Sequence, residues 1–195
     1  MATFPLLQVD ILISMDTIPK TLSSKSIYKN KFVEIKVDTL EYNGTTWEQV
    51  YFVKPHEDAA GALAIDETGI YLVRQYRYPS HQFLWQLPMG MMDKGKDELA
   101  TVREELAQEA GFTADALTKI GVVIPEAGMS GQKLGVYVAE GLHPVPTKPE
   151  KAEIGMQVRH FTFQQLKDMI KNGEISCGFT LSALMLLHNS HSTPW

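Results

Sequence analysis

The residues with the clearest chemical potential lie in one predicted helix that starts after Asp97. With successive residues roughly 100° apart around a helix axis, Glu98, Glu105 and Glu109 fall on one narrow stripe, and Gln108 lies at its edge. Carboxylates stacked at i, i+4 repel each other by roughly a few tenths of a kcal/mol, and a divalent cation would relieve this repulsion. Mg²⁺ prefers such oxygen ligands. From spacing alone, a solvated acidic face is the better explanation.

A long, spaced pattern of glycine, carboxylate and apolar residues surrounds these acids. It reads WQLPMG over 85–90, MMDKGK over 91–96 and ELAQEAGF over 105–112. The pattern resembles the Nudix box, and its two glycines, Gly90 and Gly111, have the separation found in that family. We therefore identify the chain as similar to Nudix hydrolases, in which the helix acids hold Mg²⁺ against a diphosphate.

Three positions depart from the family pattern. Lys96 stands where the family has Glu, Glu104 where it has Arg, and Gln108 where it has the first Glu of a pair. In the family the loop Glu and the helix Arg form an ion pair, so we predict that Lys96 and Glu104 form the same pair with exchanged charges. Because an amide oxygen is a weaker Mg²⁺ ligand than a carboxylate, Gln108 predicts fewer bound ions.

The resemblance implies a metal site and catalytic residues at this helix. The implied ligands of Mg²⁺ or Mn²⁺ are Glu105 and Glu109, with the amide of Gln108 and a backbone carbonyl near Met89 or Gly90. Glu105 and Glu109 are also the implied catalytic acids, and water is the nucleophile. Two carboxylates and such a backbone carbonyl are enough for one ion.

Segments outside the box resemble the ADP-ribose pyrophosphatases and related nucleoside-diphosphate-sugar hydrolases. LVRQYRYP over 72–79 is similar to a strand of that branch, whose second arginine, here Arg77, contacts the diphosphate. Trp47 and Phe32 match an aromatic clamp on adenine, although hairpin packing explains both residues as well. The branch often shares this clamp across a dimer, so the resemblance implies a homodimer that binds a nucleotide sugar or dinucleotide.

A second loop implies a general base. PEAGMSGQ over 125–132 resembles the Pro-Gly loop of the branch, with Gly128 and the backbone of Gly90 as implied substrate contacts. The closing acid of this loop corresponds to Gln132, and an amide cannot accept a proton at neutral pH. Glu126, as the acid of the loop, is therefore the predicted base; a solvated carboxylate is the alternative interpretation.

Composition limits the remaining possibilities. The 195 residues are 44% hydrophobic and carry a net charge of −5, which argues against a broad nucleic-acid-binding surface. The single cysteine, Cys177, cannot form an internal disulfide, so a reducing, cytoplasmic location is expected. The apolar stretch over 4–13 is too short for a membrane span, and we expect no membrane association.

The elements that must position these residues follow from local patterns. Alternation from Phe32 predicts a strand that turns at Asn43-Gly44, a type I′ signal, into a partner strand ending at Pro55. Further strands are predicted over 61–65, 70–75, 120–124, 134–139 and 158–163. Helices are predicted from Asp97 to Gly111, from a Thr162 cap to near Gly173, and over 181–188.

Together these elements indicate an α/β (α+β) chain. The expected architecture is a mixed β-sheet sandwiched by helices, as in the Nudix fold, with an N-terminal antiparallel sheet. Residues 1–25 are expected to form an arm or strand and residues 26–195 a single Nudix domain, divided into a hairpin subdomain over 26–58 and a core over 59–195.

Three functions remain open from the sequence. The first is Mg²⁺-dependent hydrolysis of a nucleoside diphosphate derivative such as ADP-ribose, with impaired activity. The second is a weak or inactive Nudix-fold module that binds a nucleotide sugar, because Gln108 and Gln132 replace acids. The third is an interaction scaffold. Retention of both Glu105 and Glu109 favours catalysis.

Overall fold

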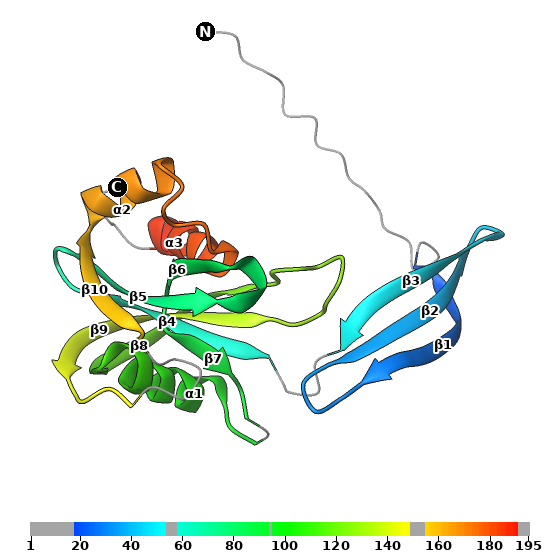
Figure 1. Cartoon of the computed structure of the whole chain (residues 1–195), viewed down its shortest axis with the longest axis horizontal. Helices are drawn as coiled ribbons and strands as arrows, with labels where there is room; N and C mark the ends of the chain where they lie inside the picture. The colour runs from blue at the N-terminus through cyan, green and yellow to red at the C-terminus, as the bar shows by residue number, and fades with distance from the viewer. Residues whose placement is uncertain (1–17, 54–57, 94, 149–154, 191–195) are drawn as a thin grey trace, which may run out of the picture. The chain divides into compact units, whose positions relative to one another are not determined.

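The computed structural model describes residues 18–53, 58–93, 95–148 and 155–190. These residues belong to two compact units, Met1–Val53 and Lys54–Trp195, which are labelled by element in Figure 1. Within the described ranges, no helix combines the length and apolar character that a membrane-spanning helix requires.

The N-terminal unit is a three-stranded antiparallel sheet in the order β1-β2-β3. The strands are β1 (Lys20–Lys29), β2 (Glu34–Tyr42) and β3 (Thr45–Val53). None of residues 18–53 is buried, so ladder hydrogen bonds and cross-strand side-chain pairs hold this sheet together within the unit.

The hairpin between β2 and β3 has the predicted turn. Tyr42 pairs with Thr45, which leaves Asn43 and Gly44 as a two-residue loop. Both have positive φ, 50° for Asn43 and 78° for Gly44, which confirms the type I′ turn. The strand expected from Phe32 begins two positions later, at Glu34, and the predicted end of its partner, Pro55, lies outside the described residues, as do residues 1–17.

The second unit is built on a seven-stranded mixed sheet. Its main order is β10-β5-β4-β9-β8, with β6 paired to β5 and β7 paired to β4. Only the β4–β9 pairing is parallel among the pairings of the described strands. The strands are β4 (Ala59–Ile65), β5 (Gly69–Arg77), β6 (Gln82–Gln86), β7 (Met89–Met91), β8 (Phe112–Val123), β9 (Leu134–Pro144) and β10 (Gln157–Thr162).

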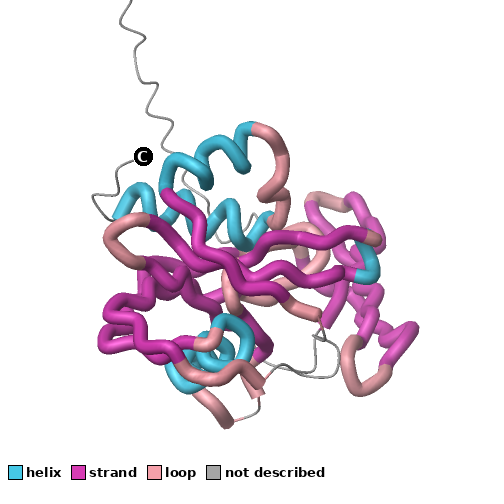
Figure 2. Tube along the Cα trace, turned by 60° about the vertical axis from the view of Figure 1, so that its left-hand side comes forward, coloured by secondary structure: helices cyan, strands magenta, loops and turns pink. Residues whose placement is uncertain are grey.

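Helices cover both faces of this sheet (Figure 1). The helix α1 (Glu98–Glu105) and the π-helical turn η3 (Leu106–Ala110) lie on one face, and α2 (Phe163–Lys171) and α3 (Gly178–Ser190) lie on the other. Figure 2 shows the same layers from another direction. This arrangement confirms the predicted mixed sheet sandwiched by helices, and the first unit confirms the N-terminal antiparallel sheet.

Each face of the sheet has its own apolar core. Val102, Leu106 and Ala110 of the helix pack with small residues of β4 such as Ala60 and Ala62 on one face. On the other face, the side chains of α2 and α3 pack on leucine and valine residues of β4, β5 and β9. The helix that carries Glu105 and Glu109 is therefore fixed to the centre of the sheet by burial of its apolar stripe.

Local signals begin and end the helices as predicted. The Asp97 side chain accepts a hydrogen bond from the N–H of Ala100 and caps α1, and Gly111 ends η3 in the left-handed conformation with φ of 73°. Thr162 and Gln165 form a capping box at the start of α2.

The differences from the sequence-based expectation that bear on the site concern β6, β7 and β8. β6 and β7 were not predicted, because they are short and depend on pairing with β5 and β4. β8 begins at Phe112 and not near Ile120, because its pairing with β9 extends along nearly its whole length. β7 matters most for the site, since it brings Met89 and Gly90 beside α1.

Candidate functional site

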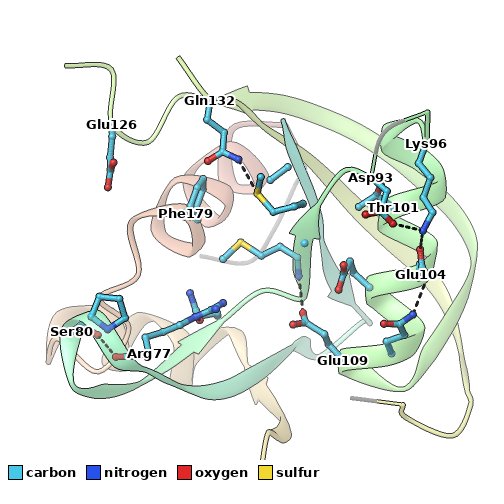
Figure 3. A pocket seen from close by; sticks show the side chains of 18 residues that line it. Arg77, Ser80, Asp93, Lys96, Thr101, Glu104, Glu109, Glu126, Gln132 and Phe179 are labelled. Atoms are coloured by element: carbon cyan, nitrogen blue, oxygen red, sulfur yellow. Dashed lines mark hydrogen bonds and ion pairs between the residues drawn. The ribbon is translucent and has the colours of Figure 1, made fainter. Parts of the chain in front are cut away.

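A cavity of about 750 Å³ lies in the second unit, beside α1, η3 and β7. Figure 3 shows its lining side chains. Seven predicted site residues line it: Arg77, Met89, Gly90, Glu105, Gln108, Glu109 and Glu126. These residues come from separate elements that the sheet brings together: β5, β7, the helix and the loop after β8.

The Glu105 carboxylate lies directly against the backbone of Gly90. A Cβ atom added to Gly90 would lie 1.8 Å from Oε1 of Glu105 and 2.4 Å from its carboxyl carbon. Any other residue at position 90 would therefore displace either the carboxylate or β7. The glycine is required here by this close approach, and not by an unusual φ.

Glu109 is held to the same strand by a hydrogen bond. The N–H of Met89 donates to Oε2 of Glu109 at 2.8 Å (Figure 3). Glu109 is only 4% exposed although it lines the cavity. A buried carboxylate needs such partners, because its desolvation is otherwise costly, so this bond fixes the Glu109 side chain beside β7.

The helix changes type between the two acids. Glu105 is the last residue of α1, whereas Gln108 and Glu109 lie in the π-helical turn η3. A π-turn inserts extra backbone into a helical turn, and such turns occur frequently at functional sites. Angular positions counted at α-helical spacing therefore do not continue unchanged from Glu98 through Glu109.

Glu98, the first acid of the stripe, does not line the cavity. Its Oε2 accepts hydrogen bonds from Lys119 Nζ at 2.5 Å and from Tyr137 OH at 2.9 Å. Burial raises the pKa of Glu98, but the bonds from Lys119 and Tyr137 outweigh it and hold the pKa below its ordinary value. Burial and the bond to Glu98 raise the pKa of Tyr137 to about 12.

The predicted ion pair with exchanged charges is confirmed. Lys96 Nζ lies 2.6 Å from Oε2 of Glu104 and 2.9 Å from Oδ2 of Asp93. The hydrogen bond to Glu104, followed by that to Asp93, raises the pKa of Lys96 above its ordinary value. The second oxygen of Glu104 accepts a hydrogen bond from the amide of Gln108 at 3.1 Å, so one carboxylate connects the loop to η3.

Arg77 lies at the wall of the cavity formed by β5 and the turn η2 (Tyr78–Ser80). Its Nε donates to Oε1 of Gln86 at 2.6 Å. An arginine has five N–H donors, and this contact uses only the Nε–H. The site therefore combines a guanidinium with carboxylates, the groups that can bind a phosphate and a divalent cation.

The loop after β8 contributes Glu126 and Gln132, and Figure 3 shows both at the side of the cavity away from Glu109. The carbonyl of Glu126 accepts hydrogen bonds from the N–H groups of Met129 and Ser130, which order the loop. Gln132 donates its amide to Sδ of Met91 at 2.9 Å. Gly128 is exposed and does not line the cavity.

The two predicted clamp aromatics lie in the N-terminal unit. Trp47 is on β3, opposite Leu40, and is 36% exposed. Phe32 is in the connection between β1 and β2, is 63% exposed, and has Lys31 Nζ 4.7 Å from its ring centre. Their exposure leaves both rings accessible for stacking.

The metal-binding capacity of the cavity rests on oxygen donors. Among the described residues, no three His, Cys, Asp or Glu side chains gather in a group that could hold a metal ion. Two carboxylates, an amide and backbone carbonyls suit a hard cation that keeps some of its water, such as Mg²⁺. The donor set therefore fits one such ion.

Sequence reasoning missed several residues of the cavity. Gln86, Thr101 and Phe179 line it, and Cys177 contacts Gln86 from the connection between α2 and α3. The signal for Gln86 was present, because a glutamine within the apolar run Trp85–Met89 needs a buried partner. Phe179 gave no signal, since a phenylalanine in an apolar helix is usually core.

The exchanged ion pair can be tested by a double-mutant cycle. K96E and E104R should each increase hydrogen exchange in the segment that joins β7 to α1, because each places like charges together. The double variant K96E/E104R should exchange more slowly than the sum of the single effects predicts. Hydrogen exchange followed by mass spectrometry measures this, with R103Q as the control on the neighbouring position. Strictly additive effects would contradict a direct pair.

Comparisons with known proteins agree with this geometry. The NUDIX domain family matches residues 55–176, more than half of the chain. An ADP-ribose pyrophosphatase of Bacillus subtilis (strain 168) is 28% identical over 170 residues, covering 86% of this chain and 91% of that protein. An ADP-ribose pyrophosphatase of Mycobacterium tuberculosis (strain ATCC 25618 / H37Rv) is 27% identical over 176 residues, covering 87% of this chain and 83% of that protein.

A solved structure shows the same fold. The crystal structure of an ADP compounds hydrolase superimposes with a TM-score of 0.80 at 19% identity, covering 88% of this chain and 92% of that one. The sequence matches, the sandwiched mixed sheet and the helix acids against β7 lead to one conclusion: the chain belongs to the Nudix family and is a pyrophosphohydrolase of that family.

Proposed function

We propose that this protein hydrolyses the diphosphate bond of a nucleoside diphosphate derivative such as ADP-ribose, with a divalent cation bound at α1 and η3. The observation that carries the proposal is the pair of carboxylates, Glu105 and Glu109, beside the backbone of β7 in a cavity that also contains Arg77. Two relatives named ADP-ribose pyrophosphatase support ADP-ribose as the substrate class.

The proposed cation is Mg²⁺ or Mn²⁺, held as a single ion. Glu105 and Glu109 would supply the charged ligands, and the amide oxygen of Gln108 and the backbone carbonyl of Met89 the neutral ones. When bound, the cation would offset the negative charge of the diphosphate and polarise its phosphorus–oxygen bonds. Because Gln108 carries no charge, we expect lower activity than an acid at this position would give.

The other cavity residues have proposed roles toward the diphosphate and the water. Arg77 would bind phosphate oxygens through its planar guanidinium, and Gly90 would offer a backbone contact. Gly128 does not line the cavity and would offer a backbone contact only from the neighbouring loop. Glu126 would accept a proton from the attacking water. The water oxygen forms the new bond to phosphorus as the bridging phosphorus–oxygen bond breaks, so ADP-ribose yields AMP and ribose 5-phosphate.

We further propose that Trp47 and Phe32 stack on the nucleobase and that the protein acts as a homodimer. Both rings are exposed in the described part of the N-terminal unit. Base–aromatic stacking is worth roughly 1–3 kcal/mol per base, which is enough to select a purine derivative over a compound that lacks a base. The dimer rests on the resemblance alone.

Binding with little or no turnover is the second candidate function. Two hydrogen bonds favour it: Gln108 donates to Glu104, and Gln132 donates to Met91. Both amides stand where the resemblance implies acids, and both are engaged in contacts that hold the surrounding structure. The assay below separates this function from hydrolysis.

Hydrolysis should be measured with ADP-ribose, NADH, UDP-glucose and GDP-mannose in the presence of Mg²⁺ or Mn²⁺, by following phosphate-monoester products. We expect turnover of ADP-ribose, and removal of the metal with EDTA should abolish it. E109Q keeps an oxygen for the Met89 N–H but removes the charge, and should lower kcat by about 100-fold or more. E126Q should lower kcat by about 100-fold if Glu126 is the base.

E98Q is the matched control, because Glu98 is on the same helix but pairs with Lys119 outside the cavity. It should leave kcat within about twofold of the unmodified protein. A thermal shift with ADP-ribose and no product would favour the binding function. The absence of both a shift and a product would leave only a scaffold role, and activity unchanged in E109Q would reject the proposed metal ligands.

The aromatic clamp and the dimer are tested together. W47A should raise the KM for ADP-ribose about tenfold, at the lower end of the stacking energy of roughly 1–3 kcal/mol, with little change in kcat. V50A is the control, because Val50 is exposed on the opposite face of β3. Sedimentation equilibrium should give the mass of two chains. A monomer, or a KM unchanged by W47A, would contradict this part of the proposal.

A further inference from the structure

Gln86 is a buried polar residue whose side-chain oxygen and nitrogen both form hydrogen bonds. It is 4% exposed at the end of β6 and lines the cavity. Oε1 accepts a hydrogen bond from Arg77 Nε at 2.6 Å, and Nε2 donates to Cys177 Sγ at 3.0 Å. A buried amide with both ends satisfied is fixed in orientation as well as in place.

The contact between Gln86 and Arg77 is not a simple cross-strand neighbour pair. In the β5–β6 register Arg77 lies opposite Gln82, whereas Gln86 lies opposite Val73. The Arg77 side chain must therefore extend back along the hairpin to reach Gln86. This contact selects one direction for a long side chain that otherwise has many rotamers.

Cys177 determines which end of the amide faces Arg77. A thiol sulfur accepts a hydrogen bond from the amide nitrogen, which turns the amide oxygen toward the guanidinium. Rotation of the amide by half a turn would place two N–H donors of Gln86 against Arg77. Cys177 is 7% exposed and comes from the connection between α2 and α3, so this hydrogen-bond partner is largely shielded from solvent.

Gln86 holds Arg77 without neutralising it. Within the described residues, none of the ion pairs involves Arg77, and the acceptor on Nε is an uncharged amide. The terminal nitrogens of the guanidinium then remain the donors for an anion, and end-on binding of a phosphate through them needs no change at Nε. A carboxylate at position 86 would hold the same nitrogen but cancel the charge.

We propose that Gln86, oriented by Cys177, is a positioning residue that fixes the charged guanidinium of Arg77 for end-on binding of the diphosphate. The inference rests on the proposed function, since it requires Arg77 to contact phosphate. It assigns to the single cysteine the role of a buried hydrogen-bond acceptor. Neither Gln86 nor Cys177 needs to touch the reacting atoms.

The test measures the Kd of ADP by isothermal titration calorimetry, together with KM and kcat for ADP-ribose. Q86M keeps the length of the side chain but removes both hydrogen-bonding ends, and should raise the Kd and the KM about tenfold while kcat changes less than threefold. R77Q should raise the Kd at least as much. The double variant R77Q/Q86M should bind ADP like R77Q alone, because Gln86 acts through Arg77.

Substitutions of Cys177 test the same contact more mildly, because they leave the Gln86 side chain unchanged. C177S keeps an acceptor and should bind ADP within twofold of the unmodified protein, whereas C177A should raise the Kd severalfold. Q75M is the matched control, because Gln75 is a buried glutamine of the same hairpin that does not line the cavity. Thermal melting of every variant confirms that it is folded.

The outcomes distinguish the role of Gln86 from the role of Arg77. An unchanged Kd in Q86M and C177A, with a raised Kd in R77Q, would overturn the role of Gln86 and leave Arg77 as a phosphate ligand. An unchanged Kd in R77Q would overturn both. Additive effects of R77Q and Q86M would show that Gln86 acts independently of Arg77, which also contradicts the inference.

Discussion

The approach of two carboxylates to the backbone of β7 is the constraint on which the site depends. Glu105 can lie against Gly90 only because that residue has no side chain, and Glu109 is fixed by the N–H of Met89. Both contacts require α1 and η3 to be fixed at one position along the sheet. The burial of Leu106 and Val102 against β4 fixes that position. The apolar stripe of the helix therefore sets the position of its acids.

The charges available to a ligand in the cavity are those that do not already form ion pairs within the protein. Lys96 and Glu104 pair with each other across the loop and the helix, and Glu98 pairs with Lys119 outside the cavity. Arg77 is held by the neutral amide of Gln86. The arrangement keeps a guanidinium on one wall and two carboxylates on another, which is the distribution that a diphosphate with a divalent cation requires.

Sequence reasoning was most successful where short-range chemistry decides the structure. The Asn43-Gly44 turn, the Gly111 stop and the Thr162 cap each depend on one or two residues. The start of β8 at Phe112 depends on its pairing with β9. Pairing between distant segments cannot be predicted from a local sequence pattern. In the site, helical spacing found Glu105 and Glu109, but contacts between distant segments decided the partners of Glu98 and the contact of Gln86 with Cys177.

We propose that Glu105 and Glu109 together hold a divalent cation against a diphosphate. Electron paramagnetic resonance of Mn²⁺, titrated into the protein with saturating ADP, measures this without turnover. We expect one bound Mn²⁺ per chain, and at least about tenfold weaker binding in the double variant E105Q/E109Q, whereas E98Q should bind Mn²⁺ normally. Equal Mn²⁺ affinity in the double variant and the unmodified protein would contradict the account.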